Sequence, residues 1–418
     1  MSGYFAGLDF GTTNSTLALA APGGAPRLLP VEGDALTIPS ALFFSLEDGE
    51  TYFGRKAVAE YVDGAEGRFM RALKSILGTS LMQETTLVGR ERLSFQELIG
   101  RFLRHLRIRL EAEGHMADGV VLGRPVHFVD DDAVADRAAQ DQLAAAAKAE
   151  GFGNIEFQYE PVAAALYYEA SVQREELALV VDIGGGTSDF TVVRLSPERA
   201  LKGRRDEDIL SSSGVHVGGT DFDRRLNIAK VMPYFGLGVP TIDGKRMMPV
   251  WYFNDMATWH RINQLYTAAI ARDIAGLAKQ AAEPEKLARF SHLLRHRSGH
   301  RLAGAVEAAK IDLTARAETA LTFSEPELTM TTTISRQEFE EATSELITRI
   351  STAIDEALLQ SSVTAQEIQT VILTGGGAEV PAVKAVATSR FPAARIVRSD
   401  AFGSVGLGLA LDAARRFA

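Results

Sequence analysis

The sequence predicts an α/β protein of two related lobes, and two observations support that prediction. One unit, in which an apolar strand, an aspartate, a Gly/Thr-rich turn and a second apolar strand follow each other, occurs twice: as "AGLDFGTTNSTLALA" at residues 6–20 and as "LALVVDIGGGTSDFTVVRL" at residues 177–195. The chain of 418 residues is also long enough for two lobes with separate cores. One pair of hairpins can match by chance, but a repeat 173 residues apart (182 minus 9, for Asp182 and Asp9) favours two lobes that face each other.

Apolar periodicity and breaker residues predict the other elements in chain order. Strands are expected at residues 4–10, at 15–21 and in "DGVVLGRPVHF", which ends near Pro125. Helices are expected at 95–113, at 136–150 before Gly151, after Pro161, and in the final "GLGLALDAARRFA". A third Gly-rich step, "TVILTGGGAEVPAVKAVATSRF", predicts a strand through Thr374, three glycines and a helix from Val380, so that backbone N–H groups and a helix N-terminus face a ligand.

The middle section, residues 231–320, is the least regular part of the sequence. It begins with the aromatic-rich "VMPYFGLGVPTIDGKRMMPVWYFND" and continues as helices. That first segment is expected to be a packed insertion in the second lobe, with a partner surface as the alternative. The basic "SHLLRHRSGHR" at residues 291–301 is expected to be a solvated helix face rather than a patch for nucleic acid or a partner.

Composition excludes several classes of function. The net charge of −10 opposes nucleic-acid binding, which needs a positive field. The absence of Cys excludes disulfides, thiolate metal sites and Cys nucleophiles, and it fits a reducing compartment. The sequence has no run of about 18 apolar residues and no basic stretch before its first apolar run, so neither a membrane span nor a secretory signal is expected. A monomeric cytoplasmic protein that binds neither nucleic acid nor membrane is the expectation.

The Gly/Thr turns are suited to holding phosphate. Such a turn presents several backbone N–H groups in one concavity, Thr hydroxyls add donors, and Gly lets the backbone approach a ligand closely. Asp9 and Asp182 end the strands that lead into the two turns, and hard carboxylate oxygens suit Mg²⁺, which keeps much of its water. Two facing units would therefore clamp the β- and γ-phosphates of a nucleotide with the metal between them.

Other known nucleotide-binding and catalytic motifs are absent from the sequence or match it incompletely. The nearest P-loop lookalike, "GVPTIDGKR" from Gly238, has five residues before its Gly-Lys rather than four, and Arg follows in place of Ser or Thr. A G-x-G-x-x-G fingerprint after a strand, H-E-x-x-H and G-x-S-x-G are all absent. The His residues show no metal-ligand spacing.

At these turns the sequence resembles the DnaK-type heat-shock chaperones of the actin-like ATPase superfamily. "GLDFGTTNS" is similar to that family's first phosphate motif, "DIGGGTSDF" to its second and "TGGGAEVP" to its adenosine motif. The connecting pieces "ALKSILG", "EPVAAAL", "GVHVGGTDFD" and "VEAAKIDLT" match in the same order over nearly the whole chain. The resemblance implies a two-lobed actin-like α/β ATPase fold with a central nucleotide cleft.

The resemblance also implies roles for particular residues, with ATP or ADP and Mg²⁺ as cofactors. Asp9 and Asp182 would order the water around Mg²⁺, and Asp182 or Asp189 would accept a proton from the attacking water. Lys74 would reach the γ-phosphate and help to position that water. Glu160 would hold a metal-bound water and, with Pro125, relay the state of the nucleotide. The catalytic set is Asp9, Lys74, Glu160, Asp182, Thr187 and Asp189.

The residues expected to bind the nucleotide come from all the matched motifs. Thr12, Thr13 and Thr187 would offer hydroxyls to phosphate or metal-bound water. Taken singly, Lys74 could be an ordinary helix lysine and Glu160 a simple charge at a helix N-terminus. The full cofactor-binding set is Gly11, Thr12, Thr13, Asn14, Gly184, Gly185, Gly186, Gly218, Gly219, Glu307, Lys310, Gly375, Gly376, Gly377 and Asp400.

The adenosine end departs from the family pattern. Glu379 stands where the family has an Arg that stacks on the base, Gly377 replaces a hydroxyl residue, and Ile311 replaces a second Arg. The loss of two guanidinium contacts, at about 0.5–2 kcal/mol each, predicts weaker nucleotide binding or altered base selectivity.

A further departure concerns the family's peptide-binding part. The family continues with an apolar linker, a peptide-gripping β-sandwich and a helical lid. These parts are not expected in this protein, which resembles the short YegD-type branch. Lobe I is expected at residues 1–172 with 393–418, and lobe II at 173–392, with no peptide-binding domain.

The leading hypothesis is a slow, Mg-dependent ATPase that acts as a nucleotide-gated, chaperone-like protein toward an unknown protein partner or co-chaperone. One alternative is a small-molecule, sugar-type kinase of the same superfamily, which would need an acceptor pocket and a base carboxylate. The other is a non-hydrolysing nucleotide-gated scaffold or filament former.

Overall fold

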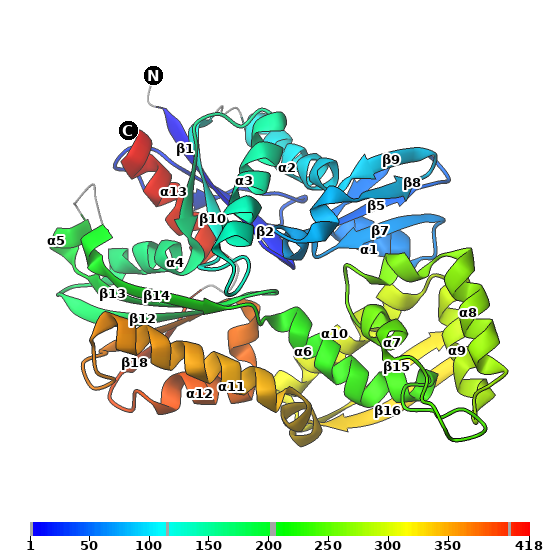
Figure 1. Ribbon diagram of the computed structural model, residues 1–418. Helices are drawn as coiled ribbons and strands as arrows, with labels where there is room; N and C mark the ends of the chain where they lie inside the picture. Colours follow the sequence, from blue (N-terminus) through cyan, green and yellow to red (C-terminus); the bar gives the residue numbers. More distant parts are fainter. Residues whose placement is uncertain (1–2, 114–116, 201–205, 400–402) are drawn as a thin grey trace. The chain divides into compact units, whose positions relative to one another are not determined.

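The computed structural model describes residues 3–113, 117–200, 206–399 and 403–418, which fall into two compact units (Figure 1). Unit 1 comprises Met1–Gly219 and Arg349–Ala418, and unit 2 comprises Thr220–Thr348. The lobe boundaries expected near residues 172 and 393 fall inside unit 1, and the division into lobes stays a prediction. No helix in the described ranges is long and apolar enough to cross a bilayer.

The first large sheet of unit 1 is built around the N-terminal hairpin and has the order β11-β10-β1-β2-β3. Strands β1 (Tyr4–Phe10) and β2 (Asn14–Ala20) are antiparallel, as the sequence predicted. Strand β10 (Ala117–Arg124) runs parallel to β1, and β11 (Ile155–Tyr159) runs parallel to β10. The short strands β3 (Arg27–Leu28) and β4 (Ile38–Pro39) pair antiparallel with β2.

The second large sheet repeats this plan, with the order β14-β13-β12-β17-β18. Strands β12 (Glu176–Ile183) and β13 (Ser188–Leu195) form the hairpin, and β14 (Ile209–Val215) is antiparallel to β13. Strand β17 (Thr370–Thr374) runs parallel to β12, and β18 (Arg395–Arg398) runs parallel to β17. The repeated unit in the sequence therefore belongs to a repeated mixed sheet, which confirms the predicted α/β class.

Two helices fill the layer between these sheets, α4 (Glu160–Tyr168) and α13 (Ser404–Phe417) (Figure 1). Their buried Ala, Val and Leu side chains share one core with strand residues of both sheets. The backbone of α13 lies very close to α4 and to β1. A Cβ on Gly408 would lie 1.8 Å from the carbonyl oxygen of Ala163, and one on Gly7 would lie 2.2 Å from the nitrogen of Ala410. The core between the sheets thus depends on small residues in both helices and in β1.

The outer faces of the two sheets carry the longer helices. Helices α2 (Phe95–Ala112) and α3 (Ala133–Ala149) cover the first sheet, and α12 (Pro381–Ser389) covers the second with the end of α11 (Arg336–Ser361) (Figure 1). A capping box between Ser94 and Glu97 starts α2. The helix predicted from residue 136 begins earlier, at Ala133, because the Asp132 carboxylate accepts hydrogen bonds from the backbone of Val134 and Ala135.

Smaller elements complete unit 1. A three-stranded sheet of β5 (Ala41–Ser45), β6 (Thr51–Phe53) and β7 (Gly67–Arg71) packs with α1 (Gly54–Val62). A hairpin of β8 (Thr85–Val88) and β9 (Glu91–Ser94) precedes α2. The remaining pieces are α5 (Pro197–Ala200) and the single turns Leu73–Ile76, Ser80–Gln83, Glu169–Ser171, Asp206–Asp208 and Gly376–Glu379.

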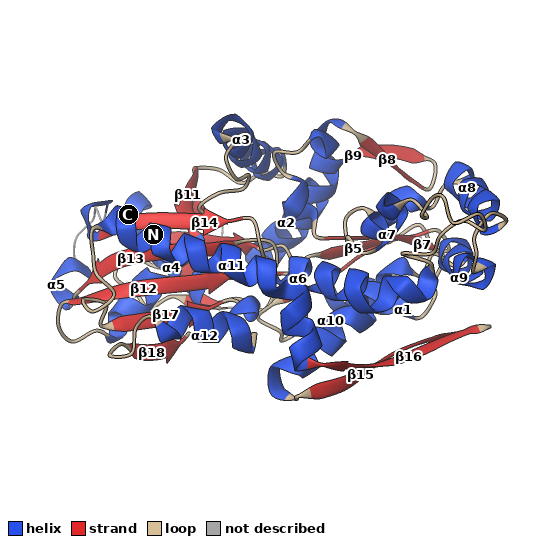
Figure 2. Ribbon diagram, turned by 60° about the horizontal axis from the view of Figure 1, so that its bottom comes forward, coloured by secondary structure: helices blue, strands red, loops and turns tan. Residues whose placement is uncertain are grey.

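Unit 2 is mainly helical and carries one hairpin. After α6 (Gly219–Leu226) come the turns Asn227–Val231, Met232–Phe235 and Ile262–Leu265 and the helices α7 (Val250–Met256), α8 (Ala268–Ala278), α9 (Pro284–Arg295) and α10 (Gly299–Ala315). Strands β15 (Glu318–Glu325) and β16 (Leu328–Ser335) form an antiparallel ribbon (Figure 2). The aromatic-rich segment is packed through Phe235, Tyr252 and Phe253, while Ile242 and Trp251 are exposed.

The basic stretch at residues 291–301 is only partly the solvated helix face that the sequence predicted, since Arg295, His296 and Arg297 are exposed but other residues are not. His292 and His300 are buried, and Ser298 lies in the turn between α9 and α10. The His292 Nε2 atom lies 3.0 Å from Oε2 of Glu325, which also pairs with Arg301. The sequence pattern did not reveal the buried part of the stretch, because its acidic partner is supplied by β15, more than twenty residues further along the chain.

Candidate functional site

The two Gly/Thr turns lie against each other in unit 1. A Cβ on Gly185 would lie 2.5 Å from Cγ2 of Thr13, and one on Gly186 would lie 2.8 Å from Oγ1 of Thr12. The second turn can approach the first this closely only because its glycines lack side chains. The facing arrangement inferred from the repeat is therefore present in the structure, and it brings together Gly11, Thr12, Thr13 and Asn14 with Gly184, Gly185, Gly186 and Thr187.

Two further glycine segments touch the same place. A Cβ on Gly218 would lie 2.4 Å from the nitrogen of Gly186, and Gly219 donates a backbone hydrogen bond of 2.9 Å to the carbonyl of Gly184. Gly375 has a φ of 77°, and its Cβ would lie 2.8 Å from Oδ1 of Asp182. Gly377 packs in the same way against Ile183. These two motifs, which the sequence analysis expected to bind nucleotide, therefore meet the second turn.

Each turn is held in place by a serine that lies outside it or at its end. The Ser40 hydroxyl donates to the carbonyl of Gly11 at 2.7 Å, and its oxygen lies 2.9 Å from that of Ser15. In the second hairpin, the Ser188 hydroxyl donates to the carbonyl of Val217 at 2.7 Å. Sequence reasoning missed Ser40, because nothing local distinguishes a serine that supports a turn 29 residues away.

A cluster of one lysine and four carboxylates lies beside these turns. The Lys74 ammonium forms an ion pair with Glu160, and both side chains are almost fully buried. Lys74 comes from the single turn Leu73–Ile76, whose Ser75 lies close to Gly186. Glu160 is the first residue of α4, and Asp9, Asp182 and Asp189 interact electrostatically with this pair. The structure thus brings together every charged residue of the expected catalytic set.

The excess of negative charge perturbs the protonation of the cluster. Burial, with a smaller contribution from Glu160, raises the pKa of Asp9 to about 7 and that of Asp189 to about 7. Burial, Glu160 and the opposing Asp189 raise the pKa of Asp182 well above its usual range. Burial alone would lower the pKa of Lys74, but Glu160 and Asp9 outweigh it, and the net shift is upward. The lysine therefore stays charged at neutral pH.

Asp189 is oriented by the turn around Pro125, to which the resemblance gave only a role in relaying the state of the nucleotide. The backbone N–H of Val126 donates to Asp189 Oδ1 at 2.6 Å. The neighbouring Arg124 is buried, and its guanidinium donates to the carbonyls of Pro125 and Val126 at 2.9 and 3.0 Å and to Asp136 at 2.8 Å. An arginine before a proline at the end of a buried strand is the signal that could have drawn attention to this turn.

The residues expected to contact adenosine are not brought together in the way that the charged catalytic residues are. Glu307 and Lys310 belong to α10 in unit 2, where the Lys310 ammonium lies 2.7 Å from Asp223. In unit 1, the exposed Glu379 lies 3.6 Å from the guanidinium of Arg398. Asp400 lies outside the described residues. The nucleotide roles of these residues stay predictions.

The donor set fits a divalent cation bound largely through water. In the described part of the chain, no three acidic or histidine side chains converge closely enough to bind a metal directly. Four carboxylates nevertheless outnumber the Lys74 ammonium, and the aspartates relieve this imbalance by taking up protons. Asp9 and Asp182 would hold Mg²⁺ through water, as such an ion keeps several of its waters.

Comparison with known proteins gives matches over most of the chain. A family model described as "Hsp70 protein" matches residues 82–232 and 288–414. The stretch between these two segments contains nearly all of the irregular, aromatic-rich part of unit 2, from residue 233 to 255.

Three relatives carry the name "Chaperone protein DnaK". The protein from Mycoplasmopsis agalactiae is 26% identical over 396 residues, 92% of this chain and 54% of its own length. Those from Thermosipho melanesiensis and Thermotoga petrophila are 26% and 28% identical over 98% and 91% of this chain. The chain spans 54–59% of the length of these relatives.

Proposed function

Because this chain belongs to the Hsp70 protein family, we propose that it binds ATP and ADP with Mg²⁺ and hydrolyses ATP slowly, as a nucleotide-gated, chaperone-like protein in the cytoplasm. The contact between the two Gly/Thr turns, with Lys74 and the carboxylates beside it, carries this proposal. The turns offer backbone N–H groups and the hydroxyls of Thr12 and Thr13, which are the donors that phosphate oxygens need.

The charged cluster supplies the chemistry of hydrolysis. Lys74 offers positive charge where negative charge develops on the transferred phosphoryl group. Asp189, with a pKa of about 7, is suited to accept a proton from the attacking water near neutral pH, and Asp182 is the alternative acceptor. Bound Mg²⁺ would neutralise phosphate charge, and Asp9 and Asp182 would hold its water shell.

The adenosine end supports the expectation of weak nucleotide binding. Ile311 is 57% exposed on α10 and offers no charge or hydrogen bond, and Glu379 is acidic. Arg398, whose guanidinium lies 3.6 Å from Glu379, is a candidate to take over part of the missing contact with the base. We expect a Kd for ATP well above the nanomolar range, and a nanomolar value in a titration would contradict this part of the proposal.

ATP turnover by purified protein tests the proposal directly. We expect slow Mg-dependent phosphate release that falls by about 100-fold in Lys74→Ala, since this change removes the charge that faces the reacting phosphate. Lys148→Ala, an exposed lysine at the end of α3, is the matched control and should turn over ATP like the unchanged protein. Equal rates in both variants would exclude the assigned role of Lys74.

The same assay separates the two alternatives. Turnover stimulated by a sugar or polyol, with a phosphorylated product, would indicate a small-molecule kinase. Binding of ATP without any turnover would indicate a non-hydrolysing scaffold. We favour hydrolysis, because Lys74 and Glu160 form a buried ion pair beside both turns. Capture of partners by Asp182→Asn protein loaded with ATP would then identify the protein or co-chaperone on which the nucleotide cycle acts.

A further inference from the structure

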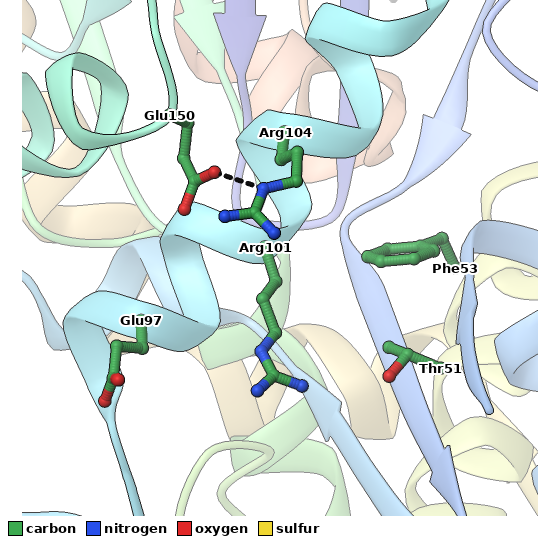
Figure 3. A pocket seen from close by; sticks show the side chains of 6 residues that line it. All are labelled: Thr51, Phe53, Glu97, Arg101, Arg104 and Glu150. Carbon is green, nitrogen blue, oxygen red and sulfur yellow. Dashed lines mark hydrogen bonds and ion pairs between the residues drawn. The ribbon is translucent and has the colours of Figure 1, made fainter. Parts of the chain in front are cut away.

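Unit 1 contains a cavity of about 370 Å³ that shares no residue with the carboxylate cluster. Its walls come from three elements: Thr51 and Phe53 on β6, Glu97, Arg101 and Arg104 on α2, and Glu150 at the end of α3 (Figure 3). The α2 residues follow helical spacing and the β6 residues alternate along a strand, so each element turns one face to the cavity. A cavity of this size suits a small organic molecule.

The charges around the cavity leave one cation available. The Glu97 carboxylate is engaged at the start of α2, where it accepts from the backbone N–H and hydroxyl of Ser94 at 2.7 Å each. Glu150 holds Arg104 through a 2.5 Å hydrogen bond to Nε (Figure 3). Arg101 makes no charged hydrogen bond of this kind within the described ranges: its guanidinium lies 5.6 Å from the centroid of the Phe44 ring and 3.8 Å from the largely exposed Glu91, and it interacts with Glu97 only through charge.

The opposite wall is apolar and firmly held. The Phe53 ring stacks on His105 at 4.4 Å between centroids and also contacts Phe102. Burial and nearby Arg109 lower the pKa of His105 to about 4, so its ring is neutral at pH 7. Thr51 adds a hydroxyl on the same side (Figure 3). A ligand would therefore meet a guanidinium on one side and a fixed aromatic ring on the other.

We propose that this cavity binds a molecule with a single carboxylate on a flat apolar body. A guanidinium pairs with a carboxylate through two parallel hydrogen bonds, and an aromatic ring accepts a flat apolar group. Glu97 and Glu150 make the cavity unsuitable for an anion of higher charge. The same chemistry is found in a free aromatic acid and in an aromatic residue at the C-terminus of a peptide.

Titration calorimetry of the full chain with three probes tests this assignment. Benzoate represents the free acid, N-acetylphenylalanine the peptide C-terminus and inorganic phosphate the anion of higher charge. We expect one of the carboxylates to bind with a Kd of about 1 mM or tighter, and the tighter of the two identifies the source. No binding by either carboxylate at about 10 mM, or phosphate binding as tightly as they do, would overturn the proposal.

Variants of Arg101 locate the binding. Arg101→Gln should weaken the carboxylate by about 10-fold, and Arg101→Lys, which keeps the charge but not the fork, by less. Arg137→Gln on α3 is the matched control, because Arg137 is exposed and pairs only loosely with Asp141 at 3.4 Å. Thermal unfolding of each variant checks that it is folded. If Arg101→Gln does not fold, Arg101→Lys tests the cavity in its place. Affinity unchanged in a folded Arg101 variant would place binding elsewhere and refute the assignment.

Discussion

The two hairpins of unit 1 have equivalent positions in their two sheets, but they differ in the residue opposite the aspartate at the end of the first strand. In the first hairpin Asp9 lies across from Thr16, and in the second Asp182 lies across from Asp189. Like charges directly opposite each other on a strand pair are destabilising. The second hairpin tolerates them because a cation from outside, Lys74, and protonation reduce the repulsion.

This difference indicates a division of labour between two otherwise similar structures. The first hairpin contributes mainly turn donors, with one carboxylate behind them. The second contributes turn donors and a pair of buried carboxylates, one of which is oriented by Val126. We therefore expect the second hairpin to matter more for hydrolysis and the first to matter more for holding phosphate.

The largest expected effect comes from neutralising each aspartate in turn. Asp182→Asn should lower ATP turnover by about 100-fold and Asp9→Asn by about 10-fold, as measured by phosphate release. Without nucleotide, Asp182→Asn should unfold at a higher temperature, because the neutral amide spares the folded state the cost of burying or protonating this carboxyl group opposite Asp189. Asp141→Asn on the exposed face of α3 should change neither quantity. A larger loss for Asp9→Asn would reverse the roles assigned to the hairpins.

The next effect concerns the space between the turns. In Gly218→Ala the new methyl group would meet the backbone of Gly185 and Gly186 at under 3 Å, so the second turn must shift. We expect ATP affinity, measured by calorimetry, to fall by about 10-fold. Gly153→Ala is the matched control, because nothing lies within 4 Å of the added carbon. Unchanged affinity in Gly218→Ala would mean that the turn does not need its observed position to bind nucleotide.

A smaller effect is expected from pH. Burial and Glu160 raise the pKa of Asp189 from 3.8 to about 7, so the folded state holds this proton more tightly than the unfolded chain. The resulting stability is complete below about pH 4 and is lost as the pH rises through about 7, by about 1 kcal/mol between about pH 6 and pH 8. Denaturant unfolding of nucleotide-free protein should show this loss, and Asp189→Asn should reduce it.

Asp9→Asn provides a second test of the loss of stability with rising pH. The pKa of Asp9 is also raised to about 7, so its removal should reduce the same loss of stability. Asp141→Asn serves as the exposed control. A pH dependence that survives both substitutions in the site would show that other groups cause it.

The smallest effect is expected from the serines that support the turns. Ser40→Ala and Ser188→Ala each remove a 2.7 Å hydrogen bond to a backbone carbonyl, which should lower the free energy of unfolding by about 1 kcal/mol. If the hairpins divide the work as inferred, Ser40→Ala should weaken ATP binding, while Ser188→Ala should mainly lower turnover. Ser344→Ala on the exposed face of α11 is the control. The opposite pattern would contradict the division.

Local sequence patterns were sufficient for the elements and for the outline of the site. The two hairpins, the Gly-rich steps and most helices depend on alternation, helical periodicity and glycine in turns, which are properties of neighbouring residues. The repeat of strand, aspartate and turn also predicted that the two turns face each other, and in the structure Gly185 lies against Thr13.

Tertiary structure alone decided which distant residues support or neutralise one another. Ser40 beneath the first turn, Arg124 behind Asp189 and Glu325 beside His292 are joined by contacts between segments far apart in sequence. The cavity between α2 and β6 has the same origin. Periodicity shows which face of an element is buried, but not which partner meets it, because the partner is selected only when the elements pack.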